Sequence, residues 1–116
     1  MQNDNDASDW RLAFQVHCNQ TQPGEQVVVV GNTPRLGSWE PHQGVKLVTA
    51  DEIYPVWHST ESLSVRELLQ GLTESQKLEY KFLILNQHDG ERWESIEGNR
   101  KITLTAAITD RSFTKT

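Results

Sequence analysis

Alternation of apolar and polar side chains is the feature of this sequence that most limits its fold. In the segment 10–17 every second side chain is apolar, namely Trp10, Leu12, Phe14 and Val16. Successive side chains of a β-strand point to opposite faces, so a period of two places these four on one side. The segment therefore predicts a strand with one buried face.

Further strands are expected throughout the chain. Alternation or a run of β-branched residues predicts them in five segments: 24–32, 45–48, 54–60, 77–86 and 101–109. The segment 24–32 contains four consecutive valines, which is typical of a strand that is buried on both faces. Asp89-Gly90 is a frequent hairpin turn, so Trp93 is expected on a strand that returns alongside 77–86.

One segment has a helical pattern instead. Ser64 and Glu67 have the spacing of a capping box, leucines follow at 68, 69 and 72, and Gly71 can end a helix. A single short helix is therefore expected at 64–71. Short strands separated by turns, with few helices, indicate an all-β sandwich or barrel.

The size and charge of the chain limit its organisation and its partners. The length of 116 residues suits one domain, and we expect a single domain at 10–116 that follows a disordered polar segment at 1–9. The longest apolar run, at 26–30, is much shorter than the roughly 20 residues of a membrane-spanning helix. A net charge of −5 works against binding to phosphate backbones or anionic lipid. Neither a nucleic acid nor a membrane is an expected partner.

The cysteine content and the N-terminus bear on the cellular compartment. Cys18 is the only cysteine, so no internal disulfide can form, and the acidic N-terminus lacks the features of a signal peptide. The compartment stays open, and an intracellular one is favoured.

The four tryptophans divide into two pairs. Trp10 and Trp57 lie within predicted strands and are expected in the core. Trp39 closes a turn that is rich in glycine and proline, and Trp93 has a charged residue on each side. These two indoles suit either a platform for a ligand or a rim that seals the core, and both interpretations stay open.

Two polar residues extend the platform interpretation. Lys81 alternates with Tyr80 and Phe82 and is expected on the opposite face. Two indoles with a lysine and an amide such as Asn99 would suit a sugar, because rings stack on its C–H faces and polar groups bind its hydroxyls. The alternative is a protein-interaction sandwich in which Trp39 and Trp93 bind a partner protein.

A catalytic or metal site is not expected. Glu94 and Glu97 are close in sequence, but no other acidic residue marks a glycosidase pocket around them. The histidines are scattered and lack the spacing of metal ligands. We expect neither an enzyme nor a cofactor.

Three stretches together resemble the signatures of starch-binding domains in carbohydrate-binding module family 20. They are "VVVVGNTPRLGSWEP", "LEYKF" and "WESIEGNR", in this order. The resemblance extends over nearly the whole chain and implies an immunoglobulin-like antiparallel β-sandwich of about seven or eight strands. It also implies non-catalytic binding of α-1,4-glucans such as starch and glycogen by a monomeric module of a larger multidomain protein. By motif position, the binding residues would be Trp39, Lys81, Trp93 and Asn99.

The sequence departs from the family pattern at three places. The stretch between Trp93 and Asn99 is one residue longer than the common form. Many members have a second site built from tyrosines, but Pro23 stands at one of those positions, which leaves Tyr54 as the candidate for a second site. The stretch 61–77 is longer than the usual tight turn, and the resemblance assigns it no function.

Overall fold

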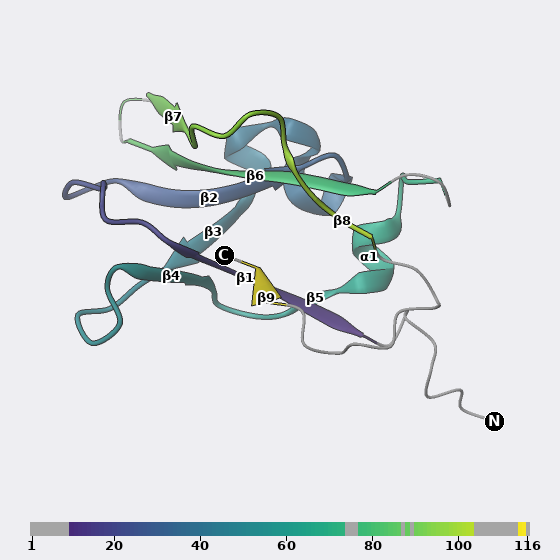
Figure 1. Cartoon of the computed structure of the whole chain (residues 1–116), viewed down its shortest axis with the longest axis horizontal. Helices are drawn as coiled ribbons and strands as arrows, with labels where there is room; N and C mark the ends of the chain where they lie inside the picture. Colours follow the sequence, from purple (N-terminus) through teal and green to yellow (C-terminus); the bar gives the residue numbers. More distant parts are fainter. Residues whose placement is uncertain (1–9, 74–76, 87, 89, 104–113, 116) are drawn as a thin grey trace.

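Nine strands form one curled sheet in the part of the chain that the computed structural model describes, residues 10–73, 77–86, 88, 90–103, 114 and 115 (Figure 1). The strands are β1 (Arg11–His17), β2 (Gln26–Gly31), β3 (Val45–Val48), β4 (Val56–Ser59), β5 (Leu63–Ser64), β6 (Leu78–Leu85), β7 (Glu91–Trp93), β8 (Arg100–Ile102) and β9 (Thr114–Lys115). Their order is β5-β1-β4-β3-β2-β6-β7, with β8 also paired to β6 and β9 to β1. Every pair is antiparallel except the short parallel pair of β1 and β9.

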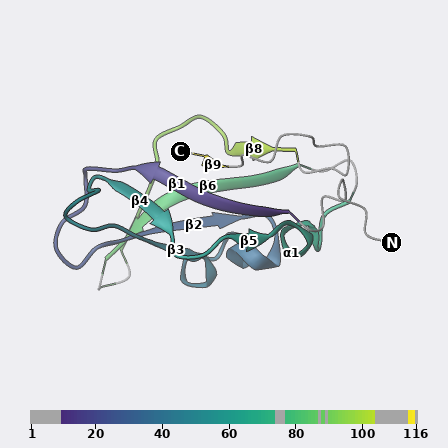
Figure 2. The same ribbon diagram turned by 90° about the horizontal axis from the view of Figure 1, so that it is seen from below.

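The sheet folds over itself into two layers. Strand β3 pairs with both β2 and β4 and so connects the layers. One layer contains β2, β6, β7 and β8, and the other contains β1, β4, β5 and β9 (Figure 1). Seen from below, β1 lies in front of β6 (Figure 2). The antiparallel β-sandwich that the sequence predicts is confirmed.

Strand β2 is buried on both faces, as its valine run predicts. Val27 and Val29 belong to the core between the layers, whereas Val28 and Val30 face the other way. All four are at most 1% exposed. The second face forms a separate cluster, here called the outer apolar patch, which consists of Val28, Val30, Leu83 and Leu85.

Three aromatic rings join the two layers. Phe14 of β1 lies edge-to-face against Tyr80 and Phe82 of β6, with ring centroids 5.2 and 6.5 Å apart. Trp10 and Trp57, each 8% exposed, extend the same core, which confirms their prediction as core residues. Tyr80 is 2% exposed, and its burial raises the pKa of the phenol to about 12.

The burial of Tyr80 predicts a loss of stability in alkali. The pKa is higher in the folded protein than the ordinary value of 10, so the stability is fully present below pH 10 and is lost as the pH rises toward 12. The free energy of unfolding should fall by about 1.4 kcal/mol per pH unit in that range. Denaturant titrations over this range measure it, and Tyr80→Phe should remove most of the pH dependence. An equal slope in both proteins would contradict the assignment.

The predicted helix is present and slightly shorter than expected. Helix α1 (Val65–Leu69) begins after Ser64, whose hydroxyl accepts a hydrogen bond from the backbone N–H of Glu67 at 3.3 Å. Gly71 follows the helix with a φ of +89°. No helix among the described residues is long and apolar enough to span a membrane.

The connection between β2 and β3 contains two short 3₁₀ helices that the sequence did not predict. They are η2 (Pro34–Trp39) and η3 (Pro41–Gln43), and each begins with a proline, whose fixed φ suits a first helical position. Gly37 lies within η2 with a φ of +80°, and a Cβ there would meet the carbonyl carbon of Gln43, the last residue of η3, at 2.6 Å. The close approach of η2 and η3 therefore depends on glycine at this position.

Two predictions lie partly or wholly outside the described residues. The N-terminal segment 1–9 is one of them. The other is the strand at 101–109, of which the structure describes β8 and Thr103. The hairpin predicted from Asp89-Gly90 is confirmed by the antiparallel pairing of β6 and β7, although Asp89 itself is outside the described residues.

Candidate functional site

Trp93 ends β7 and lies on the outer face of the sheet. It pairs across the strands with Leu83, so both side chains point to the side of the outer apolar patch. Its indole N–H donates a hydrogen bond to Glu91 Oε1 at 2.9 Å. The side chain remains 37% exposed. Trp93 is thus an oriented ring at the surface.

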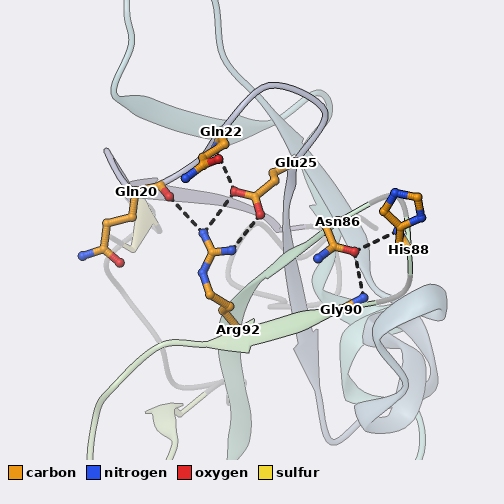
Figure 3. A network of polar contacts seen from close by, with 7 residues as sticks. All are labelled: Gln20, Gln22, Glu25, Asn86, His88, Gly90 and Arg92. Carbon is orange, nitrogen blue, oxygen red and sulfur yellow. Dashed lines mark hydrogen bonds and ion pairs between the residues drawn. The ribbon is translucent and has the colours of Figure 1, made fainter.

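Arg92 fixes β7 from the opposite face. Its guanidinium binds both carboxylate oxygens of Glu25, at 2.7 and 3.0 Å, and the carbonyl of Gln20 at 2.9 Å (Figure 3). The hydrogen bond between these side chains raises the pKa of Arg92 and lowers the pKa of Glu25. Because Arg92 is held on one side, alternation directs Glu91 and Trp93 to the other.

The turn before β7 is closed by an asparagine. Asn86 Oδ1 accepts hydrogen bonds from the backbone N–H groups of His88 and Gly90, both at 2.8 Å (Figure 3). The N–H of Asn86 also donates to the carbonyl of Gly90 at 3.0 Å. These bonds set the register in which Trp93 lies opposite Leu83.

Trp39 reaches the same face from a loop. It ends η2, within the segment 33–40 that is here called the Trp39 loop, and packs half-buried against the outer apolar patch. It is therefore less displayed than the turn pattern suggested, and it covers the outer patch instead of the main core. Ser38 and Trp39 have φ values of +48° and +70°, in the left-handed region that residues with a Cβ disfavour.

Lys81 and Asn99 lie along the same face of β6. Lys81 pairs with Val30 of the outer patch, on the side opposite Tyr80 and Phe82, as the alternation predicts. Asn99 Nδ2 donates a hydrogen bond to Glu79 Oε1 at 3.0 Å, and Glu79 lies two residues before Lys81. Same-face neighbours on a strand are about 7 Å apart, so Glu79 and Leu83 are separated by roughly 13 Å. The four predicted residues thus border one elongated surface.

Tyr54, the candidate for a second site, is not part of this surface. It lies on the turn 51–55 between β3 and β4, far from β7 in Figure 1. Its side chain is 45% exposed, and neighbouring Ile53 is 39% exposed. A hollow of about 560 Å³ adjoins this turn and is bordered by Ile53, Val56 and His58 among others.

Glu94 has a structural role. Its Oε1 accepts a hydrogen bond from the backbone N–H of Phe82 at 3.0 Å, and its Oε2 lies 2.9 Å from Arg100 Nη2. This hydrogen bonding raises the pKa of Arg100, whose guanidinium carbon lies 5.2 Å from the Phe82 ring centroid. Glu97 is exposed, whereas Glu94 is bound to Arg100 and to the backbone of Phe82, so the two carboxylates are not arranged as an acid and base pair.

A hollow of about 430 Å³ opens beside Trp93 on the inner side of the sheet. Its wall includes Trp93 itself with Phe82, Ile84, Ile96 and Arg100, but Trp39, Lys81 and Asn99 do not line it. Trp93 is therefore the one predicted site residue that borders this hollow. Among the described residues, no group of histidine, cysteine and acidic side chains could hold a metal ion.

Two residues of this face were missed by the sequence analysis. Glu91 orients the indole of Trp93, and Glu79 holds the amide of Asn99. Each lies two positions before a predicted site residue on the same strand, namely Trp93 and Lys81. This spacing of two was the signal that could have identified them.

A comparison with known families identifies the kind of domain. A family model described as "Starch binding domain" matches residues 9–114. The chain belongs to this family of starch-binding domains. It is therefore a non-catalytic carbohydrate-binding module with the β-sandwich fold of that family.

Three proteins illustrate what this starch-binding domain is similar to. It is 33% identical over 96 residues to a glucan 1,4-alpha-maltotetraohydrolase of Roseateles saccharophilus, covering 80% of this chain and 16% of that protein. The family 20 carbohydrate-binding module of a maltotetraose-forming amylase from Pseudomonas saccharophila is 32% identical, with a TM-score of 0.60 and coverage of 84% of this chain and 92% of that one. A gamma-CGTase from an alkalophilic Bacillus clarkii is 29% identical, with a TM-score of 0.66 and coverage of 90% and 14%. The starch-binding domain thus spans less than a fifth of the whole enzymes.

Proposed function

We propose that this starch-binding domain binds α-1,4-glucans on the outer face of β6 and β7, through Trp39, Trp93, Lys81 and Asn99. The observation that supports this best is the position of both indoles beside one outer apolar patch, with Lys81 on the same face. Indole rings stack on the C–H faces of sugars. Lys81 and Asn99 supply polar groups for the hydroxyls along the same strand.

The affinity should be modest. Stacking a sugar on one indole hides on the order of 50–100 Å² of apolar surface, which contributes about 1–3 kcal/mol. Two rings and a few hydrogen bonds exchanged with water, less the cost of association, give a dissociation constant between about 1 μM and 1 mM. On a polymer with many equivalent sites, binding of this strength is sufficient because repeated sites raise the effective concentration.

An open face suits a polymeric ligand. Only Trp93 of the four borders the 430 Å³ hollow, and Trp39, Lys81 and Asn99 lie outside it, so neither end of a glucan chain has to be enclosed there. The roughly 13 Å between Glu79 and Leu83 is longer than one pyranose ring. The proposed ligands are therefore starch, glycogen, maltooligosaccharides and cyclodextrin, bound along the chain.

The module is further proposed to bring an attached catalytic domain to the polysaccharide. The chain covers 16% of the maltotetraohydrolase and 14% of the gamma-CGTase to which it is similar. A module of this proportion in a larger protein would act by tethering, which raises the local concentration of substrate. Tyr54 is proposed as a secondary contact for a glucan, supported by its exposed ring on the turn between β3 and β4.

Retention on insoluble starch tests the proposal directly. The protein should sediment with starch granules, and β-cyclodextrin should release it. Trp39→Ala should weaken the retention, because its ring covers the outer apolar patch on the proposed face. A folded protein that starch does not retain would contradict the proposal and favour the Trp39 and Trp93 surface as a contact for a partner protein.

A further inference from the structure

The segment 63–72, which contains β5 and α1, packs beside the Trp39 loop. Helix α1 contacts η2, although nearly thirty residues separate them in the sequence. We propose that this segment is a brace that holds the Trp39 loop in its binding conformation, and that it acts through Thr33. This inference rests on the proposed function in one respect, because the loop conformation that the brace preserves is the one proposed to bind glucan.

Thr33 connects the brace to Trp39. Its side chain is fully buried, and its hydroxyl donates a hydrogen bond to the carbonyl of Gln70, after α1, at 2.7 Å. The carbonyl of Thr33 accepts hydrogen bonds from the N–H groups of Leu36 and Ser38 at 2.9 and 3.1 Å. The side chain of Thr33 thus binds the brace, and its carbonyl binds the backbone next to Trp39. A shift of Thr33 would therefore disturb the hydrogen bond that holds the backbone of Ser38.

Close packing adds a second contact. A Cβ on Gly71 would lie 3.2 Å from Pro34 Cδ, so the end of the brace lies directly against the first residue of η2. Arg35 and Glu67 form an ion pair at 3.5 Å, but both side chains are largely exposed. Water and salt screen such a pair, so it contributes little. The brace depends on the buried hydroxyl and on packing.

The brace is itself fixed to the core. Val65 and Leu68 of α1 are fully buried in the main hydrophobic cluster. The Trp39 loop needs such support because Ser38 and Trp39 both have left-handed backbone conformations. Residues with a Cβ keep that conformation only where the surroundings enforce it. The segment 63–72 therefore supplies contacts that a tight turn could not.

Thr33→Val tests the proposal, because valine keeps the shape and removes the hydroxyl. Fluorine NMR of protein labelled with fluorotryptophan gives one resonance per indole, and assignment uses single tryptophan-to-phenylalanine variants. The Trp39 resonance should shift and broaden in Thr33→Val without any ligand, while the Trp57 resonance stays unchanged. The dissociation constant for β-cyclodextrin should rise about three- to ten-fold, as expected for one lost hydrogen bond.

Two controls separate positioning from general stability. Thr33→Ser retains the hydroxyl and should restore both the Trp39 resonance and the affinity. Ser59 is the other buried polar residue among the described residues, and its Oγ accepts a hydrogen bond from the N–H of Phe14 at 3.1 Å. Ser59→Ala should lower the melting temperature without changing the Trp39 resonance or the affinity of the folded protein.

An unchanged Trp39 resonance in folded Thr33→Val would overturn the proposal, whatever the change in melting temperature. If Thr33→Val does not fold, Pro34→Ala replaces it, since Pro34 is exposed and a Cβ on Gly71, at the end of the brace, would lie 3.2 Å from its ring. The same displacement of the Trp39 resonance is then expected, and its absence overturns the brace. If the wild-type protein binds no glucan, the proposed function fails, whereas the fluorine spectra still decide whether the brace positions Trp39.

Discussion

Replacing Trp93 by alanine should remove most of the glucan binding and leave the stability of the fold nearly unchanged. The ring is 37% exposed and lies on an edge strand, outside both buried clusters. The loss of one stacking surface worth about 1–3 kcal/mol should raise the dissociation constant by about 5-fold to 150-fold. Calorimetric titration with β-cyclodextrin measures the affinity, and a thermal melt of the same sample measures the stability.

Ile96→Ala is the matched control for Trp93→Ala. Ile96 follows Trp93 by three residues and is also 37% exposed, so its removal deletes an apolar surface side chain from the same segment. The affinity of Ile96→Ala for β-cyclodextrin should equal that of the wild type. The assignment of Trp93 fails if Trp93→Ala binds normally, or if it melts far below the wild type so that binding is lost with the fold.

Trp57→Ala should have the opposite effect. Trp57 is 8% exposed in the main core, and its indole N–H donates a hydrogen bond to the carbonyl of Cys18 at 3.0 Å. Removing a buried aromatic ring leaves a cavity, and the free energy of unfolding should fall by about 3–5 kcal/mol. Denaturant unfolding measures this loss. The fraction that remains folded should bind β-cyclodextrin with unchanged affinity, because Trp57 is in the other layer of the sandwich.

Trp57→Phe separates the two contributions of this residue. Phenylalanine retains much of the apolar volume and removes the N–H donor, so the carbonyl of Cys18 loses its partner. Its stability should lie between those of the wild type and Trp57→Ala. A Trp57→Ala protein within about 1 kcal/mol of the wild type would show that the ring is not an essential part of the core.

Most of the strands could be predicted because their signal is local. The period of two in β1 and β6 separates core residues such as Phe14 and Phe82 from outward residues such as Lys81, without knowledge of the partner strands. Burial on both faces of β2 was also predictable from its valines. That a strand extends as far as residue 109 stays a prediction, since the structure describes only the beginning of the segment 101–109.

The conformation of the Trp39 loop could not be predicted in the same way. The sequence indicates a turn there, but the 3₁₀ helices form because Leu36 is buried and Gly37 lies against the backbone of Gln43. The link from Thr33 to Gln70 crosses nearly forty residues and leaves no periodic signal. No role for the stretch 61–77 could be predicted from the sequence either, because the contacts between α1 and η2 join residues that are far apart along the chain.

The division of one sheet edge between β7 and β8 has a consequence for association with other chains. Both strands pair with the same edge of β6. Strand β7 pairs with the last residues of β6 and β8 with the first residues of β6, and β7 and β8 are each three residues long. Between them the stretch from Glu94 to Asn99 leaves the sheet. A long, continuous edge is what recruits a foreign strand, and short edges with charged residues such as Arg92 and Lys101 resist it. The proposed ligand face at this edge should thereby be protected from sheet-to-sheet aggregation, as binding of many copies to one polysaccharide granule would require.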